Sequence, residues 1–325
     1  MSVLVVGGAG FVGLNVAEHL LTAGRAVRIL DAAPPPQAAL AAFDGLTGTL
    51  DVALGDVRDP QVVAAAMVDA THVVFGAAIT SGPEREAAEP GRVLDVNLRA
   101  FLTVLEAARD AGVRRVVNLS SGGAYGEAAF RPGVIHEDRP ADPRTLYALT
   151  KFASERLGAR MAALWGIEVV SARLSSVFGR WERRTGVRDT PSPQFQIVEA
   201  ACDGASEIVL PGDSVRDWIY GPDVARAVAL LLDAGELTHP LYNVSTGATF
   251  GVLEWGRAFA RARGGLTCRL AEAGETATIA WATSPPREPL AVDRLADATG
   301  FAPAFDCEAS ARDTADFVSR VPIRA

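Results

Sequence analysis

The chain has 325 residues, of which 49% are hydrophobic and 22% are charged, and its formal net charge is −8 at pH 7. This composition is typical of a soluble globular protein that forms one large domain or two closely packed ones. Because Lys and Arg are outnumbered by acidic residues, the composition argues against a nucleic-acid partner, whose phosphates would have to be neutralised.

Several other classes of protein are also disfavoured. No stretch approaches the ~20 apolar residues that cross a bilayer, so we expect no membrane partner. Residues 2–6 are too short an apolar run for a signal peptide and glycines follow them, so a cytoplasmic location is expected. Cys202, Cys268 and Cys307 are far apart and the four histidines are scattered, so we expect reduced thiols and no metal site.

The first half of the chain alternates short apolar runs with longer stretches of helical periodicity. The expected strands are residues 3–6, 27–30, 52–54, 72–75, 116–119 and 168–172. The expected helices are residues 14–23, 61–68 and 97–111, and one that begins near Tyr147. Strands that are apolar on both faces, separated by helices, predict a doubly wound parallel α/β sheet of the Rossmann type.

The rhythm changes after about Arg173. Residues 179–193 are rich in Arg, Gly and Pro, and later helices no longer alternate regularly with strands. We therefore expect a Rossmann domain over residues 1–173 and a smaller α/β domain over residues 174–325. Parts of 216–246 are expected to pack back on the first domain.

A glycine-rich loop follows the first expected strand and opens the first helix. It matches G-x-G-x-x-G through Gly8, Gly10 and Gly13, and it also has a glycine at position 7. Such a loop lets backbone N–H groups approach a pyrophosphate at a helix N-terminus, although it can also serve only to pack helix on strand. The expected cofactor contacts here are Gly7, Gly10, Phe11, Val12 and Gly13.

Asp31 ends the second expected strand, about 20 residues beyond the loop, where a carboxylate accepts from ribose hydroxyls. An acidic residue there repels a 2′-phosphate, so NAD is the expected cofactor. Arg28 stands three residues earlier and leaves open whether NADP is also accepted.

Tyr147 and Lys151 are four residues apart and share one face of a helix. A neighbouring cation stabilises a phenolate and makes proton transfer by tyrosine at neutral pH feasible. A pair at this spacing also occurs on many solvated helices, so its meaning depends on the glycine loop and Asp31.

With these three features in one chain, the sequence resembles the extended short-chain dehydrogenase/reductases over almost its whole length. Within them it is most similar to the NAD-dependent epimerase/dehydratase family, the group that contains the UDP-galactose 4-epimerases. The resemblance implies an NAD-dependent enzyme acting on a sugar. It also implies a homodimer formed through helix 97–111 and the Tyr147 helix, with which apolar Phe101, Leu105, Phe152 and Leu157 are compatible.

Further segments carry the resemblance around the cofactor. Residues 54–59 (Leu-Gly-Asp-Val-Arg-Asp) resemble the adenine-binding segment of the family and imply contacts from Asp56 and Val57. Residues 75–78 (Phe-Gly-Ala-Ala) stand where the family has His-x-Ala-Ala and imply a contact from Ala77. Asn97 matches the family's Asn that holds the active-site backbone, and the resemblance implies that it also contacts the cofactor.

The catalytic segment is Ser-Ser-Gly-Gly-Ala-Tyr-Gly at residues 120–126, which resembles the family's Ser-Ser-x-x-x-Tyr-Gly and implies Ser121 as the catalytic hydroxyl. By resemblance, Tyr147 removes a proton from a sugar hydroxyl while hydride passes to NAD, and Ser121 hydrogen-bonds the same oxygen. Lys151 binds the nicotinamide ribose and lowers the pKa of Tyr147.

The substrate side departs from the family pattern. Arg216, in Val-Arg-Asp-Trp-Ile, matches an Arg that meets substrate phosphate, and Arg287 is the second phosphate candidate. Ser176 replaces the family's substrate-binding Asn, which leaves open whether the sugar is nucleotide-linked. Tyr220 also stands where the family usually has a His.

An arginine cluster follows Gly179 and comprises Arg180, Arg183, Arg184 and Arg188. It suits phosphate or carboxylate recognition at the mouth of the site. The alternative is a solvated loop whose charges pair with Glu182 and Asp189. Trp181 is a further candidate for the border of the ligand.

Dehydratases of this family usually have an acidic pair after the catalytic hydroxyl residue, but this chain has Gly122 and Gly123. Neither glycine can transfer a proton, so dehydration is disfavoured. The first hypothesis is an NAD-dependent epimerase that acts on a nucleotide-linked sugar and forms a transient keto intermediate. The alternatives are a dehydrogenase of a free sugar or sugar acid with net NADH turnover, and a dinucleotide-sensing regulator without turnover.

Overall fold

The computed structural model describes residues 2–282 and 286–322. Its centre is a seven-stranded sheet in the order β11-β6-β5-β4-β1-β2-β3, and every neighbouring pair is parallel. The doubly wound α/β fold is therefore confirmed. The strands are β1 Ser2–Val6, β2 Ala26–Asp31, β3 Thr49–Leu54, β4 His72–Phe75, β5 Arg115–Ser121, β6 Glu168–Leu174 and β11 Leu241–Val244.

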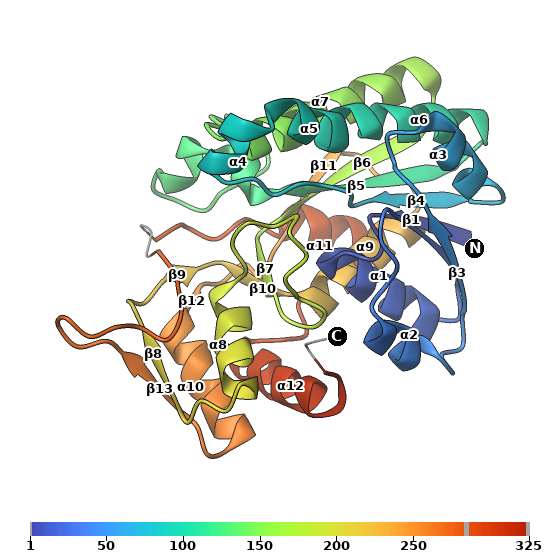
Figure 1. The fold of residues 1–325 in the computed structure, drawn as a ribbon. Helices are drawn as coiled ribbons and strands as arrows, with labels where there is room; N and C mark the ends of the chain where they lie inside the picture. Colours follow the sequence, from blue (N-terminus) through green and yellow to red (C-terminus); the bar gives the residue numbers. More distant parts are fainter. Residues whose placement is uncertain (1, 283–285, 323–325) are drawn as a thin grey trace.

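Helices cover both faces of the sheet (Figure 1). One face carries α3 Pro60–Met67, α4 Pro83–Ala88, α5 Pro90–Leu94, α6 Ala100–Asp110 and α7 Leu146–Trp165. The other carries α1 Phe11–Thr22, α2 Gln37–Phe43, α9 Gly221–Asp233 and α11 Asp293–Thr299. The four residues of β1 after Ser2 are apolar because both faces of the strand are covered: Val3 and Val5 pack in one core, while Leu4 and Val6 pack in the other.

Some local expectations differ from the structure. Helix 97–111 is one part of a longer helical stretch, in which a π-helical turn, Asp95–Arg99, joins α5 to α6. Helix α2 was not expected, because the proline run before it is typical of a loop, whereas Pro36 is in fact its N-cap. The stretch after β5 forms two 3-10 turns, Gly122–Tyr125 and Glu127–Phe130.

The remaining elements form a smaller lobe below the sheet in Figure 1. Its strand pairs are β7 Ser176–Phe178 with β10 Trp218–Tyr220, β8 Glu207–Leu210 with β13 Thr267–Leu270, and β9 Val215–Arg216 with β12 Phe250–Gly251. Its helices are α8 Pro193–Cys202, α10 Val252–Arg263 and α12 Cys307–Arg320. Trp218, Trp255 and Phe259 lie in a core of this lobe's own. The boundary at 173/174 stays a prediction, although β11 pairs with β6 in the main sheet.

Two of the residues named for a dimer interface are in the wrong place for one. Phe101 and Leu105 are fully buried in the core between the sheet and its helices, and the Phe101 ring lies 4.8 Å from that of Phe75. They face the sheet because helix α6 is amphipathic and its apolar side covers β4. Within the described part of the chain, no helix combines the length and apolarity needed to cross a membrane.

Candidate active site

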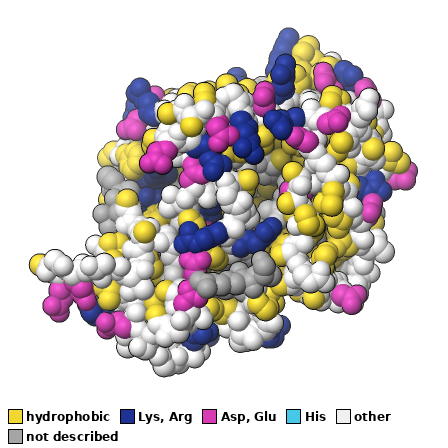
Figure 2. Space-filling model, viewed as in Figure 1, with side chains coloured by type: hydrophobic (Ala, Val, Ile, Leu, Met, Phe, Trp, Pro, Cys, Tyr) yellow, Lys and Arg dark blue, Asp and Glu magenta, His cyan; other side chains and the backbone are white. Residues whose placement is uncertain are grey.

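A cavity of about 350 Å³ opens between the carboxyl ends of the sheet strands and the smaller lobe. Figure 2 shows a hollow in the surface with dark-blue side chains along its edges, which are arginines because the single lysine of the chain is buried. Its walls include residues that follow β1, β4 and β5, where the strand order reverses and α/β folds bind ligands. The opposite walls come from β7, the segment after it, and β9.

The glycine loop forms one end of this cavity. Gly7 has a left-handed backbone (φ +76°), and a Cβ on Gly13 would lie 2.4 Å from the carbonyl oxygen of Gly7, so only glycine fits at position 13. Gly10 is the N-cap of α1 and provides no side chain to occupy the first N–H groups. Since Phe11, Val12 and Gly13 line the cavity, a pyrophosphate fits at this helix N-terminus.

Asp31 lies at the end of β2, beside the loop. Its Oδ2 accepts a hydrogen bond from the Ala9 amide at 3.0 Å, which turns the carboxylate toward the loop. Asp56 and Val57 follow β3, outside the cavity wall, and the Asp56 carboxylate accepts several bonds from Arg58, which lower its pKa. Ala77 is also outside the wall, although its neighbours Gly76 and Ala78 line it. Contacts of these residues with the cofactor stay predictions.

Asn97 lies behind the site rather than in it. It is fully buried, its Oδ1 accepts from the Ile79 amide at 2.7 Å, and its Nδ2 donates to the carbonyl of Ile79 and to the hydroxyl of Thr150. With these bonds made, Asn97 is placed to hold the backbone after β4 against α7. This corrects its assignment as a cofactor contact, since its side chain has no exposed surface to offer.

Ser121, Tyr147 and Lys151 are brought together in the cavity. Ser121 ends β5, and its hydroxyl accepts from the Gly123 amide at 3.0 Å. Thr145 caps α7, so Tyr147 and Lys151 stand in its first turns and face the end of β5. The Tyr147 phenol is hydrogen-bonded to Ser121 and Thr80. Lys151 Nζ donates to the Leu119 carbonyl at 2.7 Å and lies 5.9 Å from the centre of the Tyr147 ring.

The pKa of Tyr147 is shifted in the direction opposite to the expected one. Burial raises the pKa of its phenol above the ordinary value, and the hydrogen bond to Ser121, the charge of Arg188 and the bond to Thr80 oppose this rise. The lowering expected from Lys151 is therefore wrong for this structure. Arg188, which also lines the cavity, is the cation that favours the phenolate.

Lys151 is the only lysine in the sequence, which otherwise uses arginine for its cations. It is buried, and burial lowers its pKa to about 8, against the charge of Glu155 one turn further along α7. An ammonium with this pKa changes its charge near neutral pH, which an arginine cannot do.

We expect turnover to fall as pH rises through about 8, because Lys151 loses its positive charge there. Below about pH 8 Lys151 is charged in the folded and unfolded chains alike, so the cost of burying the charge is fully present. That cost is relieved as pH rises from about 8 toward 10.5, so the free energy of unfolding should increase over this interval. The pH dependence of kcat/KM measures the first effect. In K151R the fall of kcat/KM on the alkaline side should move to higher pH. If it does not move, another group causes the fall.

Two arginines from the smaller lobe form the far end of the cavity. Arg216 lies 5.4 Å above the Trp281 ring and Arg287 lies 4.7 Å above the Phe130 ring, measured from Cζ. Burial and the charge of Arg287 lower the pKa of Arg216 to about 10, and burial also lowers that of Arg287. Two guanidinium groups that repel each other favour an anion between them. Ser176 lines the same cavity.

Of the four arginines after Gly179, two are placed for anion recognition in the cavity and two form ion pairs away from it. Arg183 and Arg188 line the cavity, whereas Arg180 pairs with Asp313 and Arg184 pairs with Glu199. Arg188 does pair with the buried carboxylate of Glu182, at 2.8 Å. The expected pairing with Asp189 is wrong, because Asp189 binds Arg85, 3.0 Å away.

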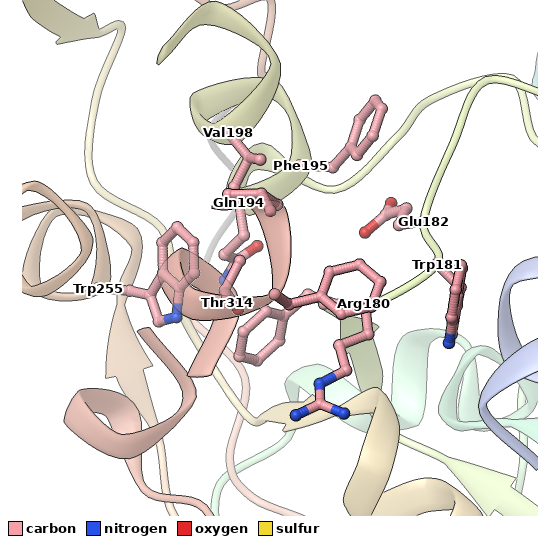
Figure 3. Close-up of a pocket in the computed structure, with 12 residues that line it drawn as sticks. Arg180, Trp181, Glu182, Gln194, Phe195, Val198, Trp255 and Thr314 are labelled. Atoms are coloured by element: carbon pink, nitrogen blue, oxygen red, sulfur yellow. The ribbon is translucent and has the colours of Figure 1, made fainter. Parts of the chain in front are cut away.

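Trp181 does not border the ligand cavity. Figure 3 shows it near Arg180 and Glu182 around a second, enclosed cavity of about 20 Å³. Its indole donates to Glu18 at 2.8 Å and packs on Phe317, so its role is to join the lobes.

Several wall residues escaped the sequence reasoning. Thr80, Asp217 and Trp281 line the cavity, and burial raises the pKa of Asp217 to about 6. Asp217 lies in the Val-Arg-Asp-Trp-Ile motif, in which only Arg216 was given a role, whereas no spacing or motif indicates Thr80 or Trp281. The uniqueness of Lys151 is a signal that was available in the composition.

Known proteins are similar to this chain in sequence and in fold. A UDP-glucose 4-epimerase of Streptomyces lividans is 31% identical over 264 residues, covering 77% of this chain and 78% of the relative. Agl12 of Haloferax volcanii, a low-salt glycan biosynthesis protein, is 30% identical over 274 residues, covering 82% and 83%. The structure of a Thermus thermophilus UDP-glucose 4-epimerase complex with NAD superimposes with a TM-score of 0.75 at 29% identity, over 98% of this chain and 99% of that one.

Residues 3–245 match the model of the NAD dependent epimerase/dehydratase family. The match extends from the glycine loop through the catalytic segment to β11, so it includes all three proposed catalytic residues. The expected cofactor agrees with the glycine loop, whose shape admits a pyrophosphate. The chain therefore belongs to this family of extended short-chain dehydrogenase/reductases, and NAD is its cofactor.

Proposed function

We propose that this protein is an NAD-dependent epimerase that acts on a nucleotide-linked sugar. The observation that carries the proposal is the meeting of Ser121, Tyr147 and Lys151 with the glycine loop in one cavity that also has Arg216 and Arg287 at its far end. The catalytic groups lie at the sheet edge and the arginines in the smaller lobe. A sugar between them would have its hydroxyl at Tyr147 and its phosphates at the arginines.

The proposed chemistry divides the work among these groups. NAD, when bound, accepts a hydride from a sugar carbon and later returns it. Tyr147 takes the proton of the sugar hydroxyl and later gives it back, with Ser121 hydrogen-bonded to the same oxygen as charge develops there. Lys151 holds positive charge near the phenol and the ribose of the cofactor.

Epimerisation requires that the keto sugar present either face to the hydride donor. Gly122 and Gly123 line the cavity, and a Cβ on Gly122 would come into ordinary van der Waals contact with the Leu174 carbonyl oxygen at 3.4 Å, so the missing side chains widen the cavity on this side. Neither residue can supply the proton transfer that elimination of water needs. This supports epimerisation over dehydration.

The nucleotide-linked substrate is supported by the paired arginines. Guanidinium groups recognise phosphate oxygens with two donors each, and two of them balance the charge of a diphosphate. The relative from Thermus is an epimerase of UDP-glucose, and MoeE5, at 25% identity, has been solved with UDP-glucuronic acid and NAD. The shorter side chain of Ser176 leaves the identity of the sugar to experiment. The homodimer stays a prediction that the family resemblance supports, and the cytoplasmic location stays a prediction from the sequence.

The decisive measurement follows both sugar product and NADH. With UDP-glucose or UDP-glucuronic acid as substrate, we expect the 4-epimer to form while absorbance of free NADH stays flat, since the hydride returns to the sugar. A dehydrogenase would instead release NADH in proportion to sugar consumed. NAD bound without conversion of any nucleotide sugar or free sugar would favour the regulator.

A further inference from the structure

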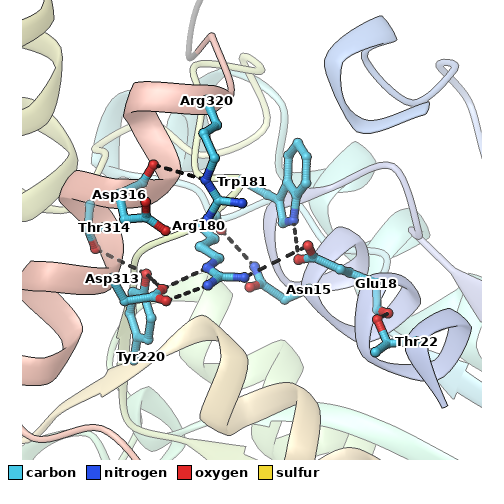
Figure 4. A network of polar contacts seen from close by, with 10 residues as sticks. All are labelled: Asn15, Glu18, Thr22, Arg180, Trp181, Tyr220, Asp313, Thr314, Asp316 and Arg320. Carbon is cyan, nitrogen blue, oxygen red and sulfur yellow. Dashed lines mark hydrogen bonds and ion pairs between the residues drawn. The ribbon is translucent and has the colours of Figure 1, made fainter. Parts of the chain in front are cut away.

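The segment between β7 and α8, residues 179–192, extends from the smaller lobe to the glycine loop beside α1 (Figure 1). Figure 4 shows how its first residues are held in place. Arg180 pairs with Asp313 of α12, the Arg180 carbonyl accepts from Asn15 Nδ2 at 2.7 Å, and Trp181 donates to Glu18 of α1. The base of this segment is therefore fixed to both lobes.

Further along, Glu182 fixes the other side of the segment. Its carboxylate is 2% exposed and accepts from the Ser192 amide and hydroxyl as well as from Arg188. The chain then pairs with the first half again, because the Thr80 amide donates to the Val187 carbonyl at 2.8 Å. Arg183 stands between these attachments, so its position is set by ordered neighbours.

Arg183 reaches the glycine loop itself. Its Nη2 donates to the Ala9 carbonyl at 2.7 Å, and its side chain lines the cavity together with Gly10 to Gly13. Its Nε is buried and has no hydrogen-bond partner among the residues that the structure describes. Asp31 is close enough for its charge to act on Arg183, and burial lowers the pKa of the guanidinium.

A buried N–H donor without an acceptor is costly, and the cost is larger on a charged group. The acceptor that fits this place is an anion, because the guanidinium faces the same space as the N–H groups of α1. Asp31, which is expected to bind a ribose of the cofactor, lies beside the glycine loop, whereas Arg216 and Arg287 lie at the other end of the cavity. We propose that Arg183 binds the pyrophosphate of NAD from the side of the smaller lobe, while the glycine loop binds it from the side of the sheet.

Arg183 belongs to the smaller lobe, so this contact would make the cofactor a bridge between the two lobes. A cofactor held in this way is retained through the cycle, as an epimerase requires and a dehydrogenase that exchanges NADH does not. The inference depends on NAD as cofactor and is independent of which sugar is the substrate.

The test compares R183Q with R184Q in the full-length protein freed of cofactor. Arg184 is the matched control, since it is the next residue, is 58% exposed and pairs with Glu199 outside the cavity. Calorimetric titration with NAD, ADP-ribose and adenosine separates the pyrophosphate from the rest of the molecule. R183Q should weaken NAD and ADP-ribose equally, by about 10- to 100-fold, and leave adenosine unchanged, whereas R184Q should be indistinguishable from the wild type.

Three results would overturn the proposal. Unchanged affinity of R183Q for NAD would show that Arg183 makes no phosphate contact. An equal loss for adenosine would show that it only packs the loop, and a loss confined to the nucleotide sugar would show that it binds the substrate. R183K replaces R183Q in this test if R183Q does not fold. Lysine keeps the positive charge but lacks the paired N–H donors of a guanidinium, so R183K should bind ADP-ribose with intermediate affinity. A wild-type protein that binds no NAD would instead contradict the cofactor itself.

Discussion

Replacing Tyr147 with Phe is expected to lower kcat by about 10²- to 10⁴-fold, the usual contribution of a positioned acid–base group. The phenol is the group at the end of β5 that lies between the hydroxyls of Ser121 and Thr80. Removing its oxygen leaves the ring in place and takes away the atom that exchanges a proton with the sugar. The variant should bind NAD as tightly as the wild type, because the cofactor site depends on the glycine loop.

The matched control is Y125F. Tyr125 is fully buried close to the site, and its hydroxyl donates to the His136 carbonyl and to Asn243 Oδ1. Its loss should lower the melting temperature and leave kcat near that of the wild type. Steady-state rates with the epimerisation substrate, together with NAD titrations, distinguish the two variants. Unchanged turnover in Y147F would remove Tyr147 from the mechanism.

Replacing Arg115 with Met is expected to lower the free energy of unfolding by about 3 kcal/mol, since the buried carbonyls of Leu231 and Leu232 and several part-buried acceptors lose their donor at once. Arg115 begins β5 and is fully buried. Its Nη1 donates to the carbonyls of Leu231 and Ala234 at 2.6 and 2.7 Å, and its Nη2 donates to that of Gly235. These carbonyls end helix α9, so the side chain caps this helix and ties it to the sheet.

Arg114 provides the control for this substitution. It is the preceding residue, it is exposed, and R114M should change stability by no more than about 0.5 kcal/mol. Equilibrium unfolding in denaturant, followed by circular dichroism, measures both variants. Equal stability of R115M and R114M would mean that water can hydrogen-bond the carbonyls at the end of α9 in place of the guanidinium.

The parts of the site that lie close together in the sequence were predictable. The glycine loop combines four glycines within seven residues with a strand before and a helix after, and Tyr147 and Lys151 share a helix face by their spacing alone. Local apolar runs likewise predicted six of the seven strands of the sheet, all except β11. Helix α2 was missed because its seven residues are too few to show a clear period behind a proline run.

The substrate side was less predictable because its residues come from separate segments. Arg216 was identified only through a motif of the family, and Trp281 had no signal at all. The four arginines after Gly179 look alike in the sequence, yet Arg180 and Arg184 pair away from the cavity while Arg183 and Arg188 line it. Which carboxylate each of them meets depends on α8 and α12, and no local pattern contains that information.

The amino-acid sequence by itself determined the α/β fold, the dinucleotide loop and the catalytic pair, because hydrophobic period and short spacing act between neighbours along the chain. Only the tertiary structure decided the electrostatics of that pair. Burial raises the pKa of Tyr147 and lowers that of Lys151, and the cation that favours the phenolate is Arg188, 41 residues beyond Tyr147 in the sequence. Solvent exclusion is a property of the packed cavity, so no segment could reveal it alone.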